Sequence, residues 1–288
     1  MKYREQVYIC GNYKEVNIFP VFECRRRCKR GKRFKPASKV QERLNQKNSE
    51  KALTRLINAN FTNKDYKLEL TFADDMLPDS LEGAKREIVN FFRRVKRARA
   101  KEGLSELKYV YSTEQGERFG RVHFHVIMTG GLSINRIAEI WGKGYVDRVK
   151  PLQFDKTGCA GIAHYFCKQQ LKNVSEGGNK STAKRWVASH NCVKPVPKSN
   201  DYRISKRSMN EIVADCEDCA AWERLYPEYK FADCKPYFND ISGLWYVSLM
   251  MYRKDYKPDI GAGGRKRNDG QRIFRAGMGD RQADKADP

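Results

Sequence analysis

The chain has 288 residues, with 57 lysines and arginines against 35 aspartates and glutamates, so its formal net charge is +22 at neutral pH. Such an excess argues against acidic partners and favours a polyanion, nucleic acid ahead of an anionic membrane surface. The N-terminal residues lack the apolar core of a signal peptide, and no apolar stretch is long enough to span a bilayer. We expect a soluble cytoplasmic protein whose nine scattered cysteines are reduced.

The N-terminal region, residues 1–38, is predicted to form a basic arm. Two short strand-like pieces, YIC and IFPVF, precede the dense basic block CRRRCKRGKRFKP. A block of this kind either contacts phosphates or remains a solvated linker, and both readings stay open. Its candidate DNA-binding residues are Arg25, Arg26, Arg27, Lys29 and Arg30.

The next segments alternate between helix and strand. Residues 39–60 have the spacing of a basic amphipathic helix, and KLELTFADD has the alternation of a half-buried strand. A second helix is predicted to begin after Asp79 or Ser80 and to end at Gly103, since a short polar side chain and a glycine are the usual caps.

Two strands, LKYVYSTE and RVHFHVIM, then flank the glycine-containing segment QGERFG, which predicts a β-hairpin. A short helix capped by Ser133 and ended by Gly142 follows, then the strand GYVDRVKPL and the helix GCAGIAHYFCKQQLKNV. This order predicts an α+β fold in which helices flank an antiparallel central sheet. Beyond residue 200 we expect a helix at 206–222 and the strand WYVSLMMYR.

The hairpin carries two of the chain's four histidines. Because side chains alternate along a strand, His123 and His125 share one face and Phe124 anchors the other. Two neighbouring imidazoles chelate a divalent ion well, although the pair alone also fits two structural histidines. Glu114, next to the turn, is predicted to reach across to His123, and Glu117 in the turn is its competitor. Two histidines and one carboxylate suit Mg²⁺ or Mn²⁺.

The helix at 159–174 presents a tyrosine away from its apolar stripe. Tyr165, Lys168 and Lys172 fall on one side of a helical wheel. A tyrosine so placed is either a surface residue or a nucleophile offered to an anionic substrate, and a metal would compensate for its pKa of about 10. The stripe on the opposite side comprises Cys159, Ile162, Ala163 and Phe166.

Three motifs together resemble the HUH endonucleases, and among them the single-tyrosine initiators of rolling-circle replication on bacterial plasmids and single-stranded DNA phages. LELTF at 68–72 resembles the first strand motif of that family, and HFH at 123–125 its histidine–hydrophobic–histidine motif. YFCK at 165–168 matches the Y-x-x-K form of the tyrosine motif. The three occur in the family's order, over roughly residues 40–200.

The resemblance implies a ferredoxin- or RRM-like fold and a metal-dependent nick in single-stranded origin DNA. Tyr165 would attack the phosphodiester, form a 5′-phosphotyrosyl link and free a 3′-hydroxyl. His123, His125 and Glu114 would hold Mg²⁺ or Mn²⁺, and Lys168 would position the phosphate or a metal-bound water.

The implied partners are the origin DNA and a host helicase and polymerase in the bacterial cytoplasm. GGNKST at 177–182 lacks a glycine that a phosphate-binding P-loop requires. Arg121 and Lys172 are expected to join the basic block in contacting DNA. The predicted domains are the arm at 1–38, the endonuclease domain at 39–200, a C-terminal helix and strand extension at 201–254 and a disordered tail at 255–288.

Two other functions stay open. Because Gln169 also completes a Y-x-x-x-Q pattern, the chain is similar to the single-tyrosine transposases as well. A non-catalytic nucleic-acid-binding protein on a ferredoxin-like sheet is the alternative of another class. Structural zinc is a further, weaker possibility, since two cysteine pairs each offer two ligands. These pairs are Cys24 with Cys28 and Cys216 with Cys219.

Overall fold

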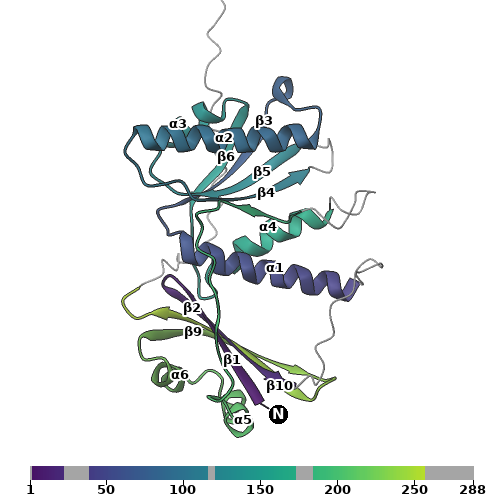
Figure 1. The fold of residues 1–288 in the computed structure, drawn as a ribbon, viewed down its shortest axis with the longest axis vertical. Helices are drawn as coiled ribbons and strands as arrows, with labels where there is room; N and C mark the ends of the chain where they lie inside the picture. Colours follow the sequence, from purple (N-terminus) through teal and green to yellow (C-terminus); the bar gives the residue numbers. More distant parts are fainter. Residues whose placement is uncertain (1, 23–38, 116–120, 173–183, 257–288) are drawn as a thin grey trace, which may run out of the picture. The chain divides into compact units, whose positions relative to one another are not determined.

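The structure is a computed structural model that describes residues 2–22, 39–115, 121–172 and 184–256, with only the backbone for 169–172 (Figure 1). The chain packs as two compact units. Unit 1 combines the described residues of Met1–Asn63, Gln153–Lys168 and His190–Arg265, and unit 2 those of Lys64–Leu152 and Gln169–Ser189.

Unit 2 repeats the order strand, helix, strand twice over, and an additional short strand lies at the sheet's edge. Its elements are β3 (Tyr66–Phe72), η1 (Asp74–Met76), α2 (Leu81–Lys101), β4 (Tyr109–Gln115), β5 (Val122–Met128), α3 (Ile134–Trp141), β6 (Gly144–Pro151) and β7 (Val187–Ala188). The strands pair antiparallel in the order β6-β3-β5-β4-β7. Without β7 this is the ferredoxin-like βαββαβ arrangement, so the predicted α+β class is confirmed.

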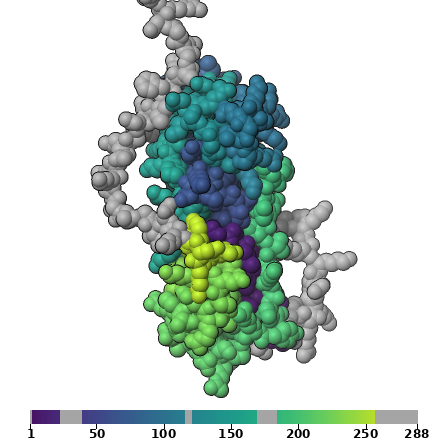
Figure 2. All heavy atoms as spheres, turned by 90° about the vertical axis from the view of Figure 1, so that its left-hand side faces the viewer, coloured from purple at the N-terminus to yellow at the C-terminus, as the bar shows by residue number. Residues whose placement is uncertain are grey.

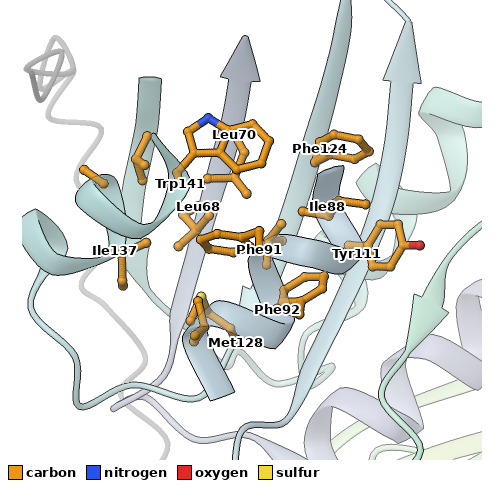
Figure 3. Close-up of a cluster of buried hydrophobic side chains, with 14 of the residues drawn as sticks. Leu68, Leu70, Ile88, Phe91, Phe92, Tyr111, Phe124, Met128, Ile137 and Trp141 are labelled. Carbon is orange, nitrogen blue, oxygen red and sulfur yellow. The ribbon is translucent and has the colours of Figure 1, made fainter. Parts of the chain in front are cut away.

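The core of unit 2 lies between its sheet and the two helices α2 and α3. Alternation along the strands turns Leu68 and Leu70 of β3 and Phe124 of β5 toward Phe91 of α2 and Trp141 of α3 (Figure 3). The Trp141 indole N–H donates to the carbonyl oxygen of Thr71 at 2.9 Å, which satisfies its polar atom inside the core. The residues of β5 that alternate with this core set must therefore occupy the opposite face of the sheet.

The helix caps of unit 2 follow the predicted chemistry. The hydroxyl oxygen of Ser80, one of the two predicted candidates, accepts from the backbone N–H of Gly83 at 3.1 Å. Ser133 likewise accepts from the N–H of Arg136 at 3.2 Å, and α3 ends at Gly142 with a left-handed φ of 56°. Only glycine adopts such a φ without a steric cost, which explains why the helix stops there.

Unit 1 is built on a second antiparallel sheet, ordered β8-β1-β2-β10-β9 among the described residues. The N-terminal hairpin pairs with the C-terminal one through β2 and β10, and Figure 2 shows these purple and yellow-green segments side by side. Its elements are β1 (Lys2–Cys10), β2 (Tyr13–Val21), α1 (Lys39–Asn60), α4 (Ala160–Lys172), β8 (Lys198–Asn200), α5 (Lys206–Ala214), α6 (Cys219–Leu225), β9 (Tyr229–Asn239) and β10 (Leu244–Arg253).

A buried ion pair attaches α1 to this sheet. The Arg55 guanidinium donates two hydrogen bonds to the Glu15 carboxylate, at 2.6 and 2.9 Å, and stacks 3.5 Å from the centre of the Tyr8 ring. Burial by itself raises the pKa of Glu15, but the hydrogen bonds from Arg55 outweigh it and hold that pKa below its ordinary value. The pair therefore stays ionised and fixes the helix to β2.

Three features of unit 1 were not predicted or were predicted differently. The single helix expected at 206–222 is two helices, because α5 ends at Ala214 and the Asp218 carboxylate caps α6 by accepting from Ala221 at 3.0 Å. Strand β9 and the joining of both ends of the chain into one sheet were not foreseen. Long-range pairing also places residues 2–22 and 201–256 in one unit, although the predicted linear domains separate them.

The basic block at 24–36 and the tail beyond residue 256 lie outside the described residues. The predicted domain boundaries stay predictions. No helix in the described ranges combines the length and hydropathy needed to cross a lipid bilayer.

We predict that Arg99→Met lowers the free energy of unfolding of unit 2 by about 2–4 kcal/mol, because buried carbonyls lose their donors. Arg99 is 2% exposed and donates to the carbonyl oxygens of Ser105, Thr129 and Gly130 at 2.7–3.2 Å. Urea denaturation followed by fluorescence measures the change. Arg97→Met, at an exposed position of the same helix, is the control, and equal stability of the two variants would contradict the prediction.

Candidate metal site and tyrosine helix

The face of the unit 2 sheet opposite its core gathers the predicted metal ligands. In the strand register, Glu69 of β3 and Ser112 of β4 lie on either side of His125. Glu114 of β4 is the register partner of His123. We call this set of residues, completed by Thr71 beside His123, the histidine face.

His125 lies between two carboxylates on the histidine face. Its ring is 2% exposed, its Nε2 lies 2.6 Å from Oε2 of Glu114, and its Nδ1 lies 3.8 Å from Oε2 of Glu69. His123 has Nδ1 at 3.9 Å from Oε1 of Glu69, and this buried nitrogen has no hydrogen-bond partner. The two imidazoles thus share one carboxylate on their Nδ1 side, and a second carboxylate stands at Nε2 of His125.

The prediction for Glu114 needs one refinement. Glu114 is directly opposite His123 in the ladder, as expected, but its carboxylate contacts His125. A long side chain reaches a diagonal neighbour across an antiparallel pair, so the register alone does not decide the contact. The alternative ligand, Glu117, lies outside the described residues.

Sequence reasoning did not single out Glu69. The alternation of KLELTF puts Glu69 on the polar side of its strand, with Leu68 and Leu70 in the core. That signal was available, but the pairing of β3 with β5, which sets Glu69 opposite His125, is a long-range contact that no local pattern discloses.

The donors of the histidine face fit a hard divalent ion. Two imidazoles and two carboxylates offer nitrogen and oxygen ligands, the kind that Mg²⁺ and Mn²⁺ accept. Across the described residues, no three His, Cys, Asp or Glu side chains are yet arranged to hold a metal ion. The direct contact of Glu114 with Nε2 of His125 accounts for this, because that carboxylate would have to turn for both groups to bind one ion.

The tyrosine helix α4 packs on α1 within unit 1. The Sγ of Cys167 lies 3.6 Å from Oγ of Ser49, and Nδ1 of His164 lies 3.1 Å from a carboxylate oxygen of Glu50. Tyr165 is half-buried and Lys168 is exposed. The predicted apolar stripe is buried, apart from a partly exposed Ile162. The helix therefore holds the tyrosine on a firmly packed element.

The predicted site residues fall into two groups. His123, His125 and Glu114 come together in unit 2, whereas Tyr165 and Lys168 lie on α4 in unit 1. Each unit supports its own part of the predicted chemistry. That both parts act on the same phosphate stays a prediction.

The expected DNA-binding residues are only partly described. The Arg121 guanidinium hydrogen-bonds the Asp74 carboxylate and approaches the Phe72 carbonyl oxygen at 3.4 Å, so part of its donor capacity is used within unit 2. The side chain of Lys172 and the arginines and lysines of the basic block lie outside the described residues.

The cysteines of unit 1 give zinc little support. Cys219 is exposed and Cys216 is half-buried, while burial raises the pKa of the nearby Cys234 thiol to about 12. Because zinc binds the thiolate, a thiol with such a pKa is a poor ligand. Cys24 and Cys28 lie outside the described residues.

Residues 65–173 match the model of a family described as replication-associated protein ORF2. The matched segment contains the whole βαββαβ arrangement of unit 2 and helix α4 with Tyr165. No curated protein and no solved structure matches the chain. The family match supports a role in DNA replication.

We predict that the protein binds one Mn²⁺ ion through the histidine face, because its imidazoles and carboxylates are adjacent. Isothermal titration calorimetry measures the affinity, and the double variant His123→Ala/His125→Ala is expected to lose the binding. The control is His190→Ala, which removes an exposed histidine of unit 1. Undiminished Mn²⁺ binding by the double variant would rule out the histidine face as the site.

Proposed function

We propose that this protein initiates rolling-circle DNA replication by nicking single-stranded origin DNA through a tyrosine. The observation that carries the proposal is the histidine face, where two imidazoles and two carboxylates gather on one side of a ferredoxin-like sheet. The match of residues 65–173 to a replication-associated family supports the same conclusion. The excess of 57 basic over 35 acidic residues favours a nucleic-acid substrate.

The proposed chemistry exchanges one phosphoester bond for another. The Tyr165 oxygen attacks the scissile phosphorus, the bond from phosphorus to the 3′-oxygen breaks, and the 5′-phosphate remains on the tyrosine. The phenol proton is released and the departing 3′-oxygen takes up a proton, so charges and atoms balance without ATP. Because the new ester resembles the old one, the step is reversible, and the joined strand is recovered by attack of a 3′-hydroxyl.

The residues have distinct roles in this scheme. His123, His125 and Glu114 would hold Mg²⁺ or Mn²⁺, which when bound supplies Lewis-acid polarisation of the phosphate. Lys168 follows Tyr165 by one helical turn and is exposed, so its ammonium group is available to a phosphate oxygen. A cation there stabilises the negative charge that develops as the phenol attacks.

The freed 3′-hydroxyl defines the partners that we propose. It is the primer end that a polymerase extends, and continued extension on a duplex requires strand separation by a helicase. Both activities are assigned to the host, and the origin DNA is the substrate.

We predict a covalent protein–DNA adduct when the protein is incubated with labelled single-stranded origin DNA and Mn²⁺. A denaturing gel detects it as a band of reduced mobility. Tyr165→Phe removes the attacking oxygen and is expected to abolish the band, with a loss of at least about 100-fold, as for removal of a nucleophile. Tyr202→Phe is the matched control, because that ring is 85% exposed and lies outside the motif.

Two results would overturn parts of the proposal. An adduct that persists in Tyr165→Phe would exclude this tyrosine as the nucleophile. DNA bound without any adduct in the wild type would favour a non-catalytic binding protein, and joining of strands at transposon ends, without origin nicking, would favour a transposase.

A further inference from the structure

Glu69 occupies a position on the histidine face that the proposed ligand set does not use. Its two carboxylate oxygens face different rings, with Oε1 at 3.9 Å from Nδ1 of His123 and Oε2 at 3.8 Å from Nδ1 of His125. Its side chain is only 13% exposed. A single carboxylate thus faces the same nitrogen of both imidazoles.

A local irregularity of the sheet brings a cation to this carboxylate. The ladder between β3 and β6 shifts its register between Lys67 and Glu69. At the shift, Arg148 has a φ of 50°, the one positive value found for a non-glycine residue in the described ranges. Bulges re-aim side chains near active sites, and a non-glycine residue holds such a φ only where its surroundings enforce it.

The bulge turns Arg148 onto the histidine face. Its Nη1 lies 3.1 Å from Oε2 of Glu69, although the Arg148 side chain itself is 69% exposed. An arginine holding one oxygen of a carboxylate restricts how that carboxylate rotates. The order of contacts therefore runs from Arg148 to Glu69 and from Glu69 to the two rings.

The unpaired Nδ1 of His123 indicates what Glu69 is for. A buried ring nitrogen without a partner is costly, and the oxygen that Glu69 presents lies about 1 Å beyond hydrogen-bond distance. A histidine that ligates a metal through one nitrogen usually donates the N–H of its other nitrogen to a carboxylate or carbonyl. Glu69 is placed to accept from both rings at once.

We propose that Glu69 is the positioning residue of the metal site. It accepts a hydrogen bond from Nδ1–H of His123 and of His125, so that both Nε2 atoms are left to the divalent ion with Glu114. Arg148 fixes the orientation of Glu69. This inference rests on the proposed function, because it assigns a role around the same metal site.

Metal affinity tests the role of Glu69. Titration of Mn²⁺ into Glu69→Ala and into Arg148→Met is expected to show an affinity about 10–100-fold below that of the wild type, the usual effect of removing an outer partner of a ligating histidine. Glu69→Gln keeps an acceptor oxygen and is expected to fall between the wild type and Glu69→Ala. Glu82→Gln, at an exposed glutamate of α2, is the control and should bind as the wild type does.

A spectroscopic measurement separates positioning from a merely structural effect. The chain has four histidines, so long-range ¹H–¹⁵N spectra of ¹⁵N-histidine protein resolve the proton position on each ring. With Zn²⁺ as a diamagnetic probe, both His123 and His125 should carry their proton on Nδ1. In Glu69→Ala one or both rings should lose this single state, while circular dichroism shows the same fold. If Glu69→Ala does not fold, Glu69→Gln gives the decisive comparison.

The possible failures are distinguishable. Wild-type Mn²⁺ affinity in both Glu69→Ala and Arg148→Met would overturn the inference and leave the proposed metal site intact. Zn²⁺ bound to Nδ1 of either ring would also overturn it, because Glu69 would then be on the ligand side. A wild type that binds no Mn²⁺ would overturn this inference and the proposed metal dependence together, whereas loss of the DNA adduct alone would concern only the nicking step.

Discussion

The antiparallel register of β5 with its two neighbours is the constraint on which the site depends. Phe124 must enter the core between the sheet and its helices, so His123 and His125 must lie on the other side. Pairing with β3 then places Glu69 beside His125, and pairing with β4 adds Glu114. A slip of one residue would bury the imidazoles in the core and turn Phe124 outward, so fold and chemistry are set by the same alignment.

The placement of the tyrosine depends on a different kind of packing. Helix α4 buries Ala163 and Phe166 completely and is tied to α1 through Cys167 and His164. Helix α1 is in turn fixed to its sheet by the ionised pair of Glu15 and Arg55. A nucleophile carried on a helix with such support is held more firmly than one on a loop.

Local patterns sufficed for the elements and for one part of the site. Alternation in RVHFHVIM predicts the shared face of His123 and His125, and Ser80 and Ser133 cap the helices as short polar side chains do. Glu69 and Arg148 were missed because their roles arise from strand pairing and from a bulge, which depend on residues distant in the sequence. The second sheet was missed for the same reason, since β2 finds its partner β10 at the far end of the described chain.

The central claim is that Tyr165 becomes bonded to DNA in a reaction that needs the histidine face. The most direct measurement is mass spectrometry of tryptic peptides after reaction with origin DNA and Mn²⁺, followed by nuclease trimming. Cleavage after Lys156 and Lys168 gives the peptide TGCAGIAHYFCK, which contains a single tyrosine. The account predicts a nucleotide mass on Tyr165 of this peptide, absent when His123 and His125 are both alanine. A nucleotide on any other residue, or on Tyr165 without these histidines, would contradict it.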